Sequence, residues 1–144
     1  LQGGPWGRPF AFKGVDMALG YKDLLDRADA AVTSVTTDEA AKLLSDPGVV
    51  FVDIRDPREL ERTGKISGAH HAPRGMLEFW IDPASPYHKP YFAEDKLFVF
   101  YCASGWRSLL ATEVAQSMGL RCASLRGGFT SWAEAQQPTV PHER

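Results

Sequence analysis

Short apolar runs alternate with amphipathic segments along most of this chain. Residues 49–54 and 97–101 are nearly continuous apolar runs rich in β-favouring residues, which is typical of strands buried on both faces. The same reasoning predicts shorter strands at 34–35, 69–72 and 121–125, and helices at 21–31, 39–44, 57–62 and 76–80, from 108 onward, and before Pro138. This alternation predicts an α/β domain whose mainly parallel sheet is covered by helices on both faces.

Start signals support two of these helices. Thr37 or Asp38 is placed to cap the helix at 39–44. Asp56 caps the next helix, and Pro57 follows at the first helical position, where its missing N–H costs little.

The chain divides into one domain and two extensions. Its 144 residues suit a single core. Residues 33–138 form the predicted domain, residues 1–32 an N-terminal extension and residues 139–144 a C-terminal tail. Residues 1–14 are rich in glycine and proline without a clear period, which predicts an irregular segment dispensable for activity. The helix at 21–31 either docks on the domain or binds a partner.

Composition excludes several classes of protein. A hydrophobic content of 44%, a charged content of 24% and a net charge of −2 describe an ordinary globular protein. There is no run rich in Lys and Arg, so we expect no nucleic-acid partner. No apolar stretch is long enough for a bilayer and no secretory pattern is present, so we expect no membrane association and a cytoplasmic location.

Cys102 is the candidate catalytic nucleophile. It follows the predicted strand at 97–101, and the small residues after it allow a tight loop that opens a helix. Such a loop points backbone N–H groups inward at a helix N-terminus, which favours a nucleophilic thiolate. The alternative is a buried cysteine with no chemistry. Cys122 lies in a short predicted strand without a glycine loop, so we expect it to be a packing residue.

Neither a disulfide scaffold nor a metal site is predicted. The chain has two cysteines, which suits a reducing compartment, and they are not spaced as a redox pair. His70 and His71 are adjacent on a predicted strand and therefore point to opposite faces, so they cannot share a metal ion. We expect no metal and no cofactor.

Four segments together resemble the rhodanese-like domain family. They are an acidic strand-to-helix motif at 51–59, a glycine-containing turn at 64–70, a cysteine loop at 102–107 and a closing helix signature at 127–132. All four occur in the family's order and spacing, across residues 33–138. The resemblance implies a three-layer rhodanese-like fold, with a five-stranded, mainly parallel sheet and helices on both faces.

The resemblance also implies a sulfurtransferase that works through a persulfide on Cys102. The thiolate would take a sulfane sulfur from a small donor, such as thiosulfate or mercaptopyruvate. It would pass this sulfur to a thiol or cyanide acceptor, with a protein acceptor as a further option. The backbone N–H groups of residues 104–107 would stabilise the persulfide anion. The implied substrate-binding loop consists of Ala103, Ser104, Gly105, Trp106 and Arg107.

Loop length bears on the choice between two reactions. Phosphatase-like relatives of this fold place five residues between the cysteine and the arginine, whereas four residues separate Cys102 from Arg107. The narrower cradle suits one sulfur atom better than a phosphoryl group. Donor choice stays open, because Ala103, Ser104 and Gly105 lack the basic side chains of thiosulfate-preferring members. The small residue followed by Ser-Gly resembles mercaptopyruvate-using members, which usually carry threonine at the position of Arg107.

The residues around the loop have alternative roles. Arg107 either pairs with an acid or a loop carbonyl, or binds the donor. Trp106 restricts access, stacks on a substrate or packs on the sheet edge. Asp53 and Arg55 are expected to give structural support, and Glu59 to pair with Arg55 or to cap its helix.

Residues 82–95 form a long connection rich in proline and tyrosine. One interpretation is a partial lid over Cys102, with His88 as a group that exchanges protons near neutral pH. The other is a loop packed at the far end of the sheet.

The rival to an enzyme is a non-enzymatic rhodanese-like module. Such a module would bind a protein partner through the same cleft, or through the helix at 21–31 and residues 82–95. An intact cysteine loop favours the enzyme.

Overall fold

The computed structural model describes residues 18–142. The predicted irregular segment at 1–14 therefore lies outside the described residues. Within the described part of the chain, no helix combines the length and the apolar character needed to cross a bilayer.

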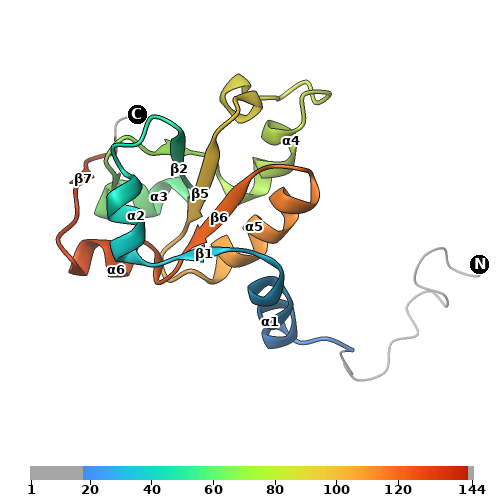
Figure 1. Cartoon of the computed structure of the whole chain (residues 1–144), viewed down its shortest axis with the longest axis horizontal. Coiled ribbons are helices and arrows are strands. Elements are labelled where there is room, and N and C mark those ends of the chain that lie inside the picture. The colour runs from blue at the N-terminus through green and yellow to red at the C-terminus, as the bar shows by residue number, and fades with distance from the viewer. Residues whose placement is uncertain (1–17, 143–144) are drawn as a thin grey trace, which may run out of the picture.

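A five-stranded parallel sheet forms the centre of the molecule (Figure 1). Its strands in spatial order are β1 (Ser34–Val35), β6 (Cys122–Leu125), β5 (Leu97–Tyr101), β2 (Val49–Asp53) and β4 (His70–His71). All neighbouring pairs are parallel. The strands therefore share one direction, and their C-terminal ends meet at one edge of the sheet. This confirms the parallel sheet expected for the α/β domain.

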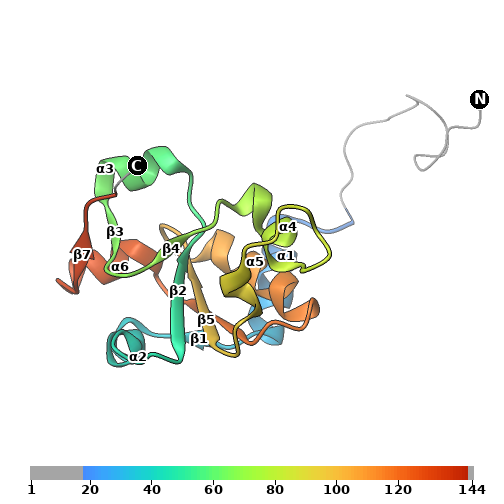
Figure 2. The same cartoon turned by 90° about the horizontal axis from the view of Figure 1, so that it is seen from above.

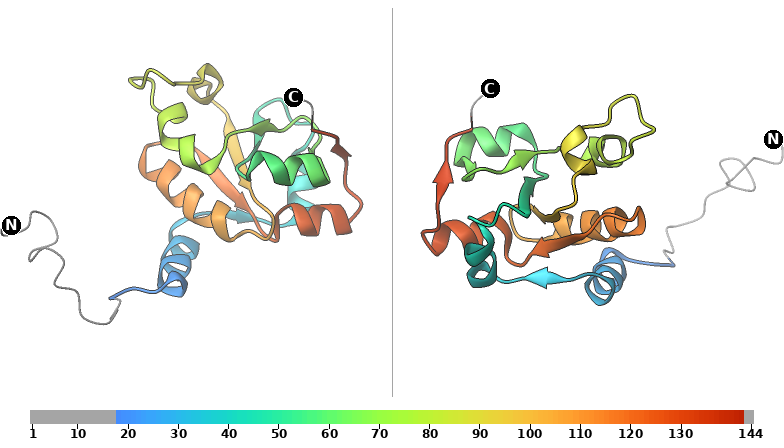
Figure 3. Two further views of the ribbon diagram at one scale, coloured as in Figure 1. Left: turned by 180° about the vertical axis from the view of Figure 1, so that it is seen from behind. Right: turned by 45° about the horizontal axis from the view of Figure 1, so that its top comes forward.

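Helices cover both faces of this sheet, as Figure 2 and the two views of Figure 3 show. The α-helices are α1 (Tyr21–Ala31), α2 (Thr37–Leu43), α3 (Pro57–Thr63), α4 (Leu77–Ile81), α5 (Trp106–Ser117) and α6 (Gly128–Glu134). In the described part of the chain, the short 3-10 helices η2 (Arg74–Met76) and η3 (Pro90–Ala93) lie in the connections.

Side chains along β5 alternate between the two faces of the sheet, which explains why helices pack on both faces. Phe98 and Phe100 point into a core shared with α4, α5 and η3, whereas Val99 and Tyr101 point into a core shared with α2 and α6. These four side chains are fully buried. Successive residues of a strand face opposite ways, so a continuous apolar run is what a doubly covered strand requires.

The structure corrects two local expectations and adds one pair of strands. The cap of α2 is Thr36, whose hydroxyl accepts a hydrogen bond from the backbone N–H of Glu39, rather than Thr37 or Asp38. Helix α5 begins at Trp106 rather than Ser108, because Gly105 adopts a left-handed conformation at its N-cap. The sequence also did not predict the antiparallel pair of β3 (Lys65–Ile66) and β7 (Thr139–Val140).

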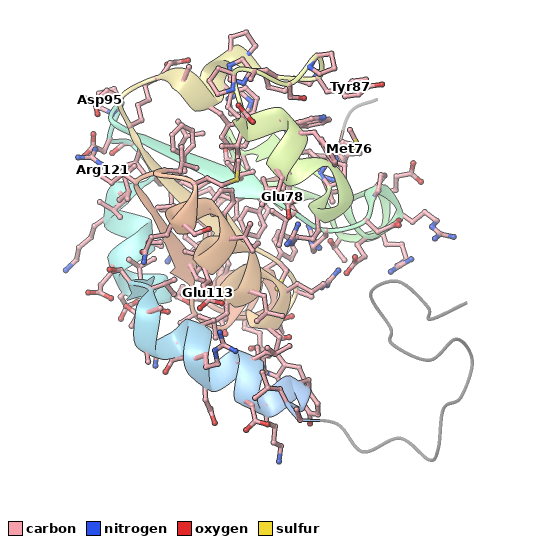
Figure 4. All side chains as sticks on the ribbon, turned by 90° about the vertical axis from the view of Figure 1, so that its right-hand side faces the viewer. Met76, Glu78, Tyr87, Asp95, Glu113 and Arg121 are labelled. Carbon is pink, nitrogen blue, oxygen red and sulfur yellow. The ribbon has the colours of Figure 1, made fainter. Side chains whose placement is uncertain are left out.

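The lid interpretation of residues 82–95 is wrong. This segment packs where β5 begins: the ring of Phe92 lies 5.3 Å from that of Phe98. Figure 4 shows Asp95 and Arg121 near one another at this end of the sheet. Cys102 follows the other end of β5. The segment joins α4 to the start of β5, and Phe92 buries its ring there, so the loop stays at the far end.

Candidate active site

Cys102 lies at the C-terminal edge of the sheet, directly after β5. The next residues form a short loop, and α5 starts at Trp106. In open parallel sheets, ligands bind beyond the C-terminal ends of the strands. The position of Cys102 therefore matches the part of this fold where chemistry is expected.

The Cys102 sulfur accepts hydrogen bonds from two backbone N–H groups. Gly105 N lies 3.2 Å and Ser108 N 3.4 Å from Sγ. Both donors stand at the start of α5, where unpaired N–H groups and the helix dipole favour negative charge. Two backbone donors at the start of a helix therefore face the Cys102 sulfur.

Ser108 is a neighbour of the sulfur that the sequence analysis did not single out. Its hydroxyl lies 3.7 Å from Cys102 Sγ. It also donates to the carbonyl of Gly105 at 3.2 Å and lies 3.0 Å from the hydroxyl of Ser124 on β6. Both serines are buried. The sequence holds no direct signal for this pair, because a serine near a helix start is usually exposed.

The loop rests on the start of α6. Phe129 N–H donates to the carbonyl of Cys102 at 2.8 Å, and Thr130 N–H donates to that of Ala103 at 3.0 Å. A Cβ atom at Gly128 would lie 2.5 Å from the Cys102 carbonyl oxygen. Only glycine fits there, so the closing helix signature at 127–132 holds the cysteine loop in place.

Arg107 reaches across to the acidic motif. Its two terminal nitrogens each donate to the Glu59 carboxylate at 2.9 Å. These hydrogen bonds lower the pKa of Glu59 from 4.5 to about 2 and raise the pKa of Arg107. The Cys102 sulfur adds a smaller upward contribution to the pKa of Arg107, since it lies near the guanidinium. Glu59 also accepts from Asp56 N–H at 3.0 Å and so helps to cap α3.

Asp53 and Arg55, in the same acidic motif, form a buried ion pair. Arg55 donates to both carboxylate oxygens of Asp53, at 2.8 to 3.2 Å. It also donates to the Thr63 hydroxyl and the Gly64 carbonyl, and its guanidinium lies 4.4 Å from the centre of the Phe129 ring. These contacts join β2, α3 and α6, so the pair supports the frame of the site.

Trp106 lies on the rim of the loop, on the side of α1. Its ring centre is 5.5 Å from that of Tyr21, and both side chains are more than half exposed. A pocket of about 220 Å³ next to this pair is lined partly by Ser104, Gly105 and Trp106. Helix α1 is present where the sequence predicted a helix, and Figure 4 shows it beside α5.

Cys122 is distant from this site. It pairs with Phe98 at the start of β5, whereas Cys102 follows the end of the same strand. Its sulfur donates to the carbonyls of Thr112 and Leu120, and burial raises the pKa of this thiol to about 11. Its surroundings suit a packing residue.

The two adjacent histidines point to different partners. His71 Nε2 lies 2.7 Å from the carbonyl oxygen of Arg55, whereas the His70 ring stacks on Tyr91 at 4.1 Å. Among residues 18–142, no cluster of His, Cys, Asp or Glu side chains could hold a metal ion.

Comparisons with known proteins agree with this geometry. The family model for the Rhodanese-like domain matches residues 36–135. The chain belongs to this family. It is 32% identical over 115 residues to the human thiosulfate:glutathione sulfurtransferase, covering 74% of this chain and 98% of that protein.

Solved structures give the same fold. A Rhodopseudomonas palustris protein of unknown function, described as a possible tyrosine phosphatase, is 51% identical with a TM-score of 0.85. The match covers 90% of this chain and 100% of that one. A rhodanese-related protein from Thermoplasma volcanium is 27% identical with a TM-score of 0.63, over 76% of this chain and 99% of that one. The rhodanese-like fold expected from the sequence is thus confirmed.

Proposed function

We propose that this chain is a sulfurtransferase that carries sulfane sulfur as a persulfide on Cys102. The observation that supports it most is the pair of backbone N–H groups, from Gly105 and Ser108, that face the Cys102 sulfur at the start of α5. The same donors would stabilise the negative charge of a persulfide, as an oxyanion hole stabilises an alkoxide. The name of the human relative adds support for sulfur transfer.

In the first half-reaction, the Cys102 thiolate attacks the outer sulfur of the donor. With thiosulfate, the new bond joins Cys102 Sγ to the outer sulfur of the donor. The S–S bond within thiosulfate breaks, and its electron pair leaves on sulfite. With mercaptopyruvate, the C–S bond breaks and the electron pair leaves on carbon as the enolate of pyruvate, which then takes up a proton. Either donor leaves one sulfur on the enzyme.

In the second half-reaction, an acceptor attacks the outer sulfur of the persulfide. Cyanide would take up this sulfur to form thiocyanate, and a thiolate would take it up to form a new persulfide. The electron pair of the broken S–S bond returns to Cys102 and restores the thiolate. The acceptor is then a small thiol, cyanide or a protein thiol.

Access to the sulfur requires movement at the rim of the loop. Cys102 has no exposed surface. A donor therefore reaches Sγ only when rim side chains shift. Arg107 is 44% exposed and lies near the sulfur, so it is a candidate for this shift.

A steady-state assay tests the proposal. Thiosulfate and mercaptopyruvate are offered as donors, with cyanide and a small thiol as acceptors. Parallel double-reciprocal lines would support a persulfide intermediate, because donor and acceptor react in separate steps. The Cys102→Ser variant should be inactive. A folded wild-type protein that transfers no sulfur between any of these pairs would favour the non-enzymatic module.

The same samples test the phosphatase alternative. Arg107 is the fifth residue after Cys102, and its guanidinium is paired with Glu59. We therefore expect no hydrolysis of p-nitrophenyl phosphate above the rate of the Cys102→Ser variant.

A further inference from the structure

Two buried hydroxyl groups lead away from the Cys102 sulfur. The Cys102 thiol donates to the Ser108 hydroxyl oxygen at 3.7 Å, and that hydroxyl lies 3.0 Å from the hydroxyl of Ser124. Ser108 belongs to the first turn of α5, whereas Ser124 lies on β6. A helix and a strand thus bring two groups that can both donate and accept hydrogen bonds next to the buried sulfur.

The pair of hydroxyls ends at a pocket of about 220 Å³ beside α1. Ser124 lines this pocket together with Ser34, whereas Ser108 does not. Two other lining residues, Asp29 and Arg126, are more than half exposed, so the pocket is open to solvent. A proton that reaches the Ser124 hydroxyl can therefore pass to solvent there.

Cys102 must lose its proton before it attacks a donor, because the thiolate is the nucleophile. Its side chain has no exposed surface through which solvent could take that proton. The backbone N–H groups of Gly105 and Ser108 only donate to the sulfur. Hydrogen bonds to Glu59 raise the pKa of Arg107, so this guanidinium keeps its proton as well. Among the described groups that bond to the sulfur, the Ser108 hydroxyl is the one that can take up a proton and pass another on.

We propose that Ser108 and Ser124 form a proton relay, which carries the proton of the Cys102 thiol to solvent in the pocket beside α1. Ser108 is the catalytic residue of this relay, since it touches the reacting sulfur, and Ser124 is a positioning residue that acts through Ser108. The inference rests on the proposed function, because it concerns the activation of the thiol that forms the persulfide.

The relay consists of three proton transfers. Ser108 Oγ takes the proton of the Cys102 S–H bond, and the proton that Ser108 held passes to Ser124 Oγ. The proton that Ser124 held passes to a water molecule in the pocket. Each electron pair stays on the atom that gives up its proton, so Cys102 becomes a thiolate and both serines remain neutral. Ser108 first turns its hydroxyl from the Gly105 carbonyl, at 3.2 Å, toward Ser124.

Exchange of the Cys102 S–H group for S–D in heavy water tests the relay. The infrared S–H stretching band is followed at about pH 5, where an ordinary cysteine thiol carries its proton. Cys122→Ser is the parent protein, because Cys102 is then its only thiol. Ser108→Ala and Ser124→Ala each remove one member of the relay. Thr112→Val is the matched control: the Thr112 hydroxyl is also buried on α5, but it donates to the Ser108 carbonyl at 2.6 Å.

We expect Ser108→Ala and Ser124→Ala to slow the exchange by about a hundredfold, the lower end of the effect of a positioned proton-transfer group. Thr112→Val should exchange at the rate of the parent. The S–H band should move to higher frequency in Ser108→Ala alone, because that variant removes the acceptor of the thiol proton. A merely structural role predicts the opposite sign, since loss of a buried hydrogen bond favours local opening and speeds the exchange.

Exchange that is unchanged or faster in either serine variant would overturn the relay. Equal slowing in Thr112→Val would also overturn it, because the effect would then follow the loss of any buried hydroxyl on α5. Intact-mass measurement of sulfur loading from thiosulfate or mercaptopyruvate, on the same samples, separates the relay from the proposed function. A parent protein that loads sulfur, with exchange independent of both serines, would overturn the relay alone. A folded parent that loads no sulfur, with exchange slowed in both serine variants, would overturn the sulfurtransferase and leave the proton path.

Discussion

Each terminal nitrogen of Arg107 lies 2.9 Å from a different oxygen of the Glu59 carboxylate. The two residues are 48 positions apart in the sequence. They meet because β2 and β5 are neighbours in the parallel sheet, so the segments after both strands emerge at the same edge. The family's acidic motif and its cysteine loop are therefore parts of one site.

This pair should make stability depend on acid pH. The pKa of Glu59 is about 2 in the folded protein and 4.5 in its ordinary state, so its contribution is present above pH 4.5. That contribution is lost as the pH falls from about 5 to about 2. Thermal unfolding of the wild type and Glu59→Gln should give melting temperatures that converge over this range.

A double-mutant cycle with Arg107→Gln is the control. In the Arg107→Gln background, adding Glu59→Gln should have little pH-dependent effect, because the partner that lowers the pKa is absent. An unchanged pH-dependent difference in that background would contradict the assignment of the effect to this pair.

Gly128 is predicted to be essential for the shape of the cysteine loop. Gly128→Ala places a methyl group against the carbonyls of Cys102 and Ala103, at 2.5 and 2.7 Å. Gly119→Ala is the matched control, since Gly119 also has a positive φ but a Cβ atom there meets nothing within 4 Å. Urea unfolding should show that Gly128→Ala loses about 1–3 kcal/mol more stability than Gly119→Ala.

The two variants should also differ at Cys102. Sulfur loading of Cys102 should be impaired in Gly128→Ala and normal in Gly119→Ala. Equal stability and equal loading in the two variants would show that α6 does not hold the loop.

Two arginines, each paired with the aspartate two positions before it, allow a direct comparison of buried and exposed ion pairs. Arg55 and Asp53 are buried, whereas Arg58 and Asp56 are largely exposed. Arg55→Met leaves a buried carboxylate without its cation and should cost about 3–5 kcal/mol of unfolding free energy. Arg58→Met should leave unfolding unchanged within error, because solvent screens that pair. Denaturant unfolding of both variants would test this, and equal losses would contradict it.

The central strand was predictable because its whole apolar run is buried. Residues 97–101 were predicted as a strand with the bounds of β5, and the doubly covered sheet followed from the same pattern. The cysteine loop was found for a related reason: glycine and small residues after such a strand predict a turn into a helix. These features depend on residues adjacent in the sequence.

Features that depend on distant residues were harder to predict. The strands β3 and β7 have two residues each and pair across the domain, so they carry no period of their own. The sequence allowed several partners for Glu59 and several for Arg107. The order of strands in the sheet brings these two residues together, and that order is not visible in the local sequence. Ser108 shows the same limit, since its buried partner Ser124 is 16 positions away.

Two further errors have different origins. The pattern Thr36-x-x-Glu39 is a capping-box signature and was available in the sequence, so the correct cap of α2 was within reach. The lid over Cys102 failed because chain length alone allowed residues 82–95 to reach either end of the sheet. Burial of Phe92 beside the start of β5 decided the matter.

The most direct test of this account is the intact mass of the full chain after incubation with thiosulfate or mercaptopyruvate and removal of the donor. We predict the addition of one sulfur atom, located on Cys102 by peptide mapping and removed by a thiol reductant. Cys122→Ser should load in the same way, and Cys102→Ser should not load. A folded wild-type protein that gains no sulfur from either donor, or gains it on Cys122, would contradict the account.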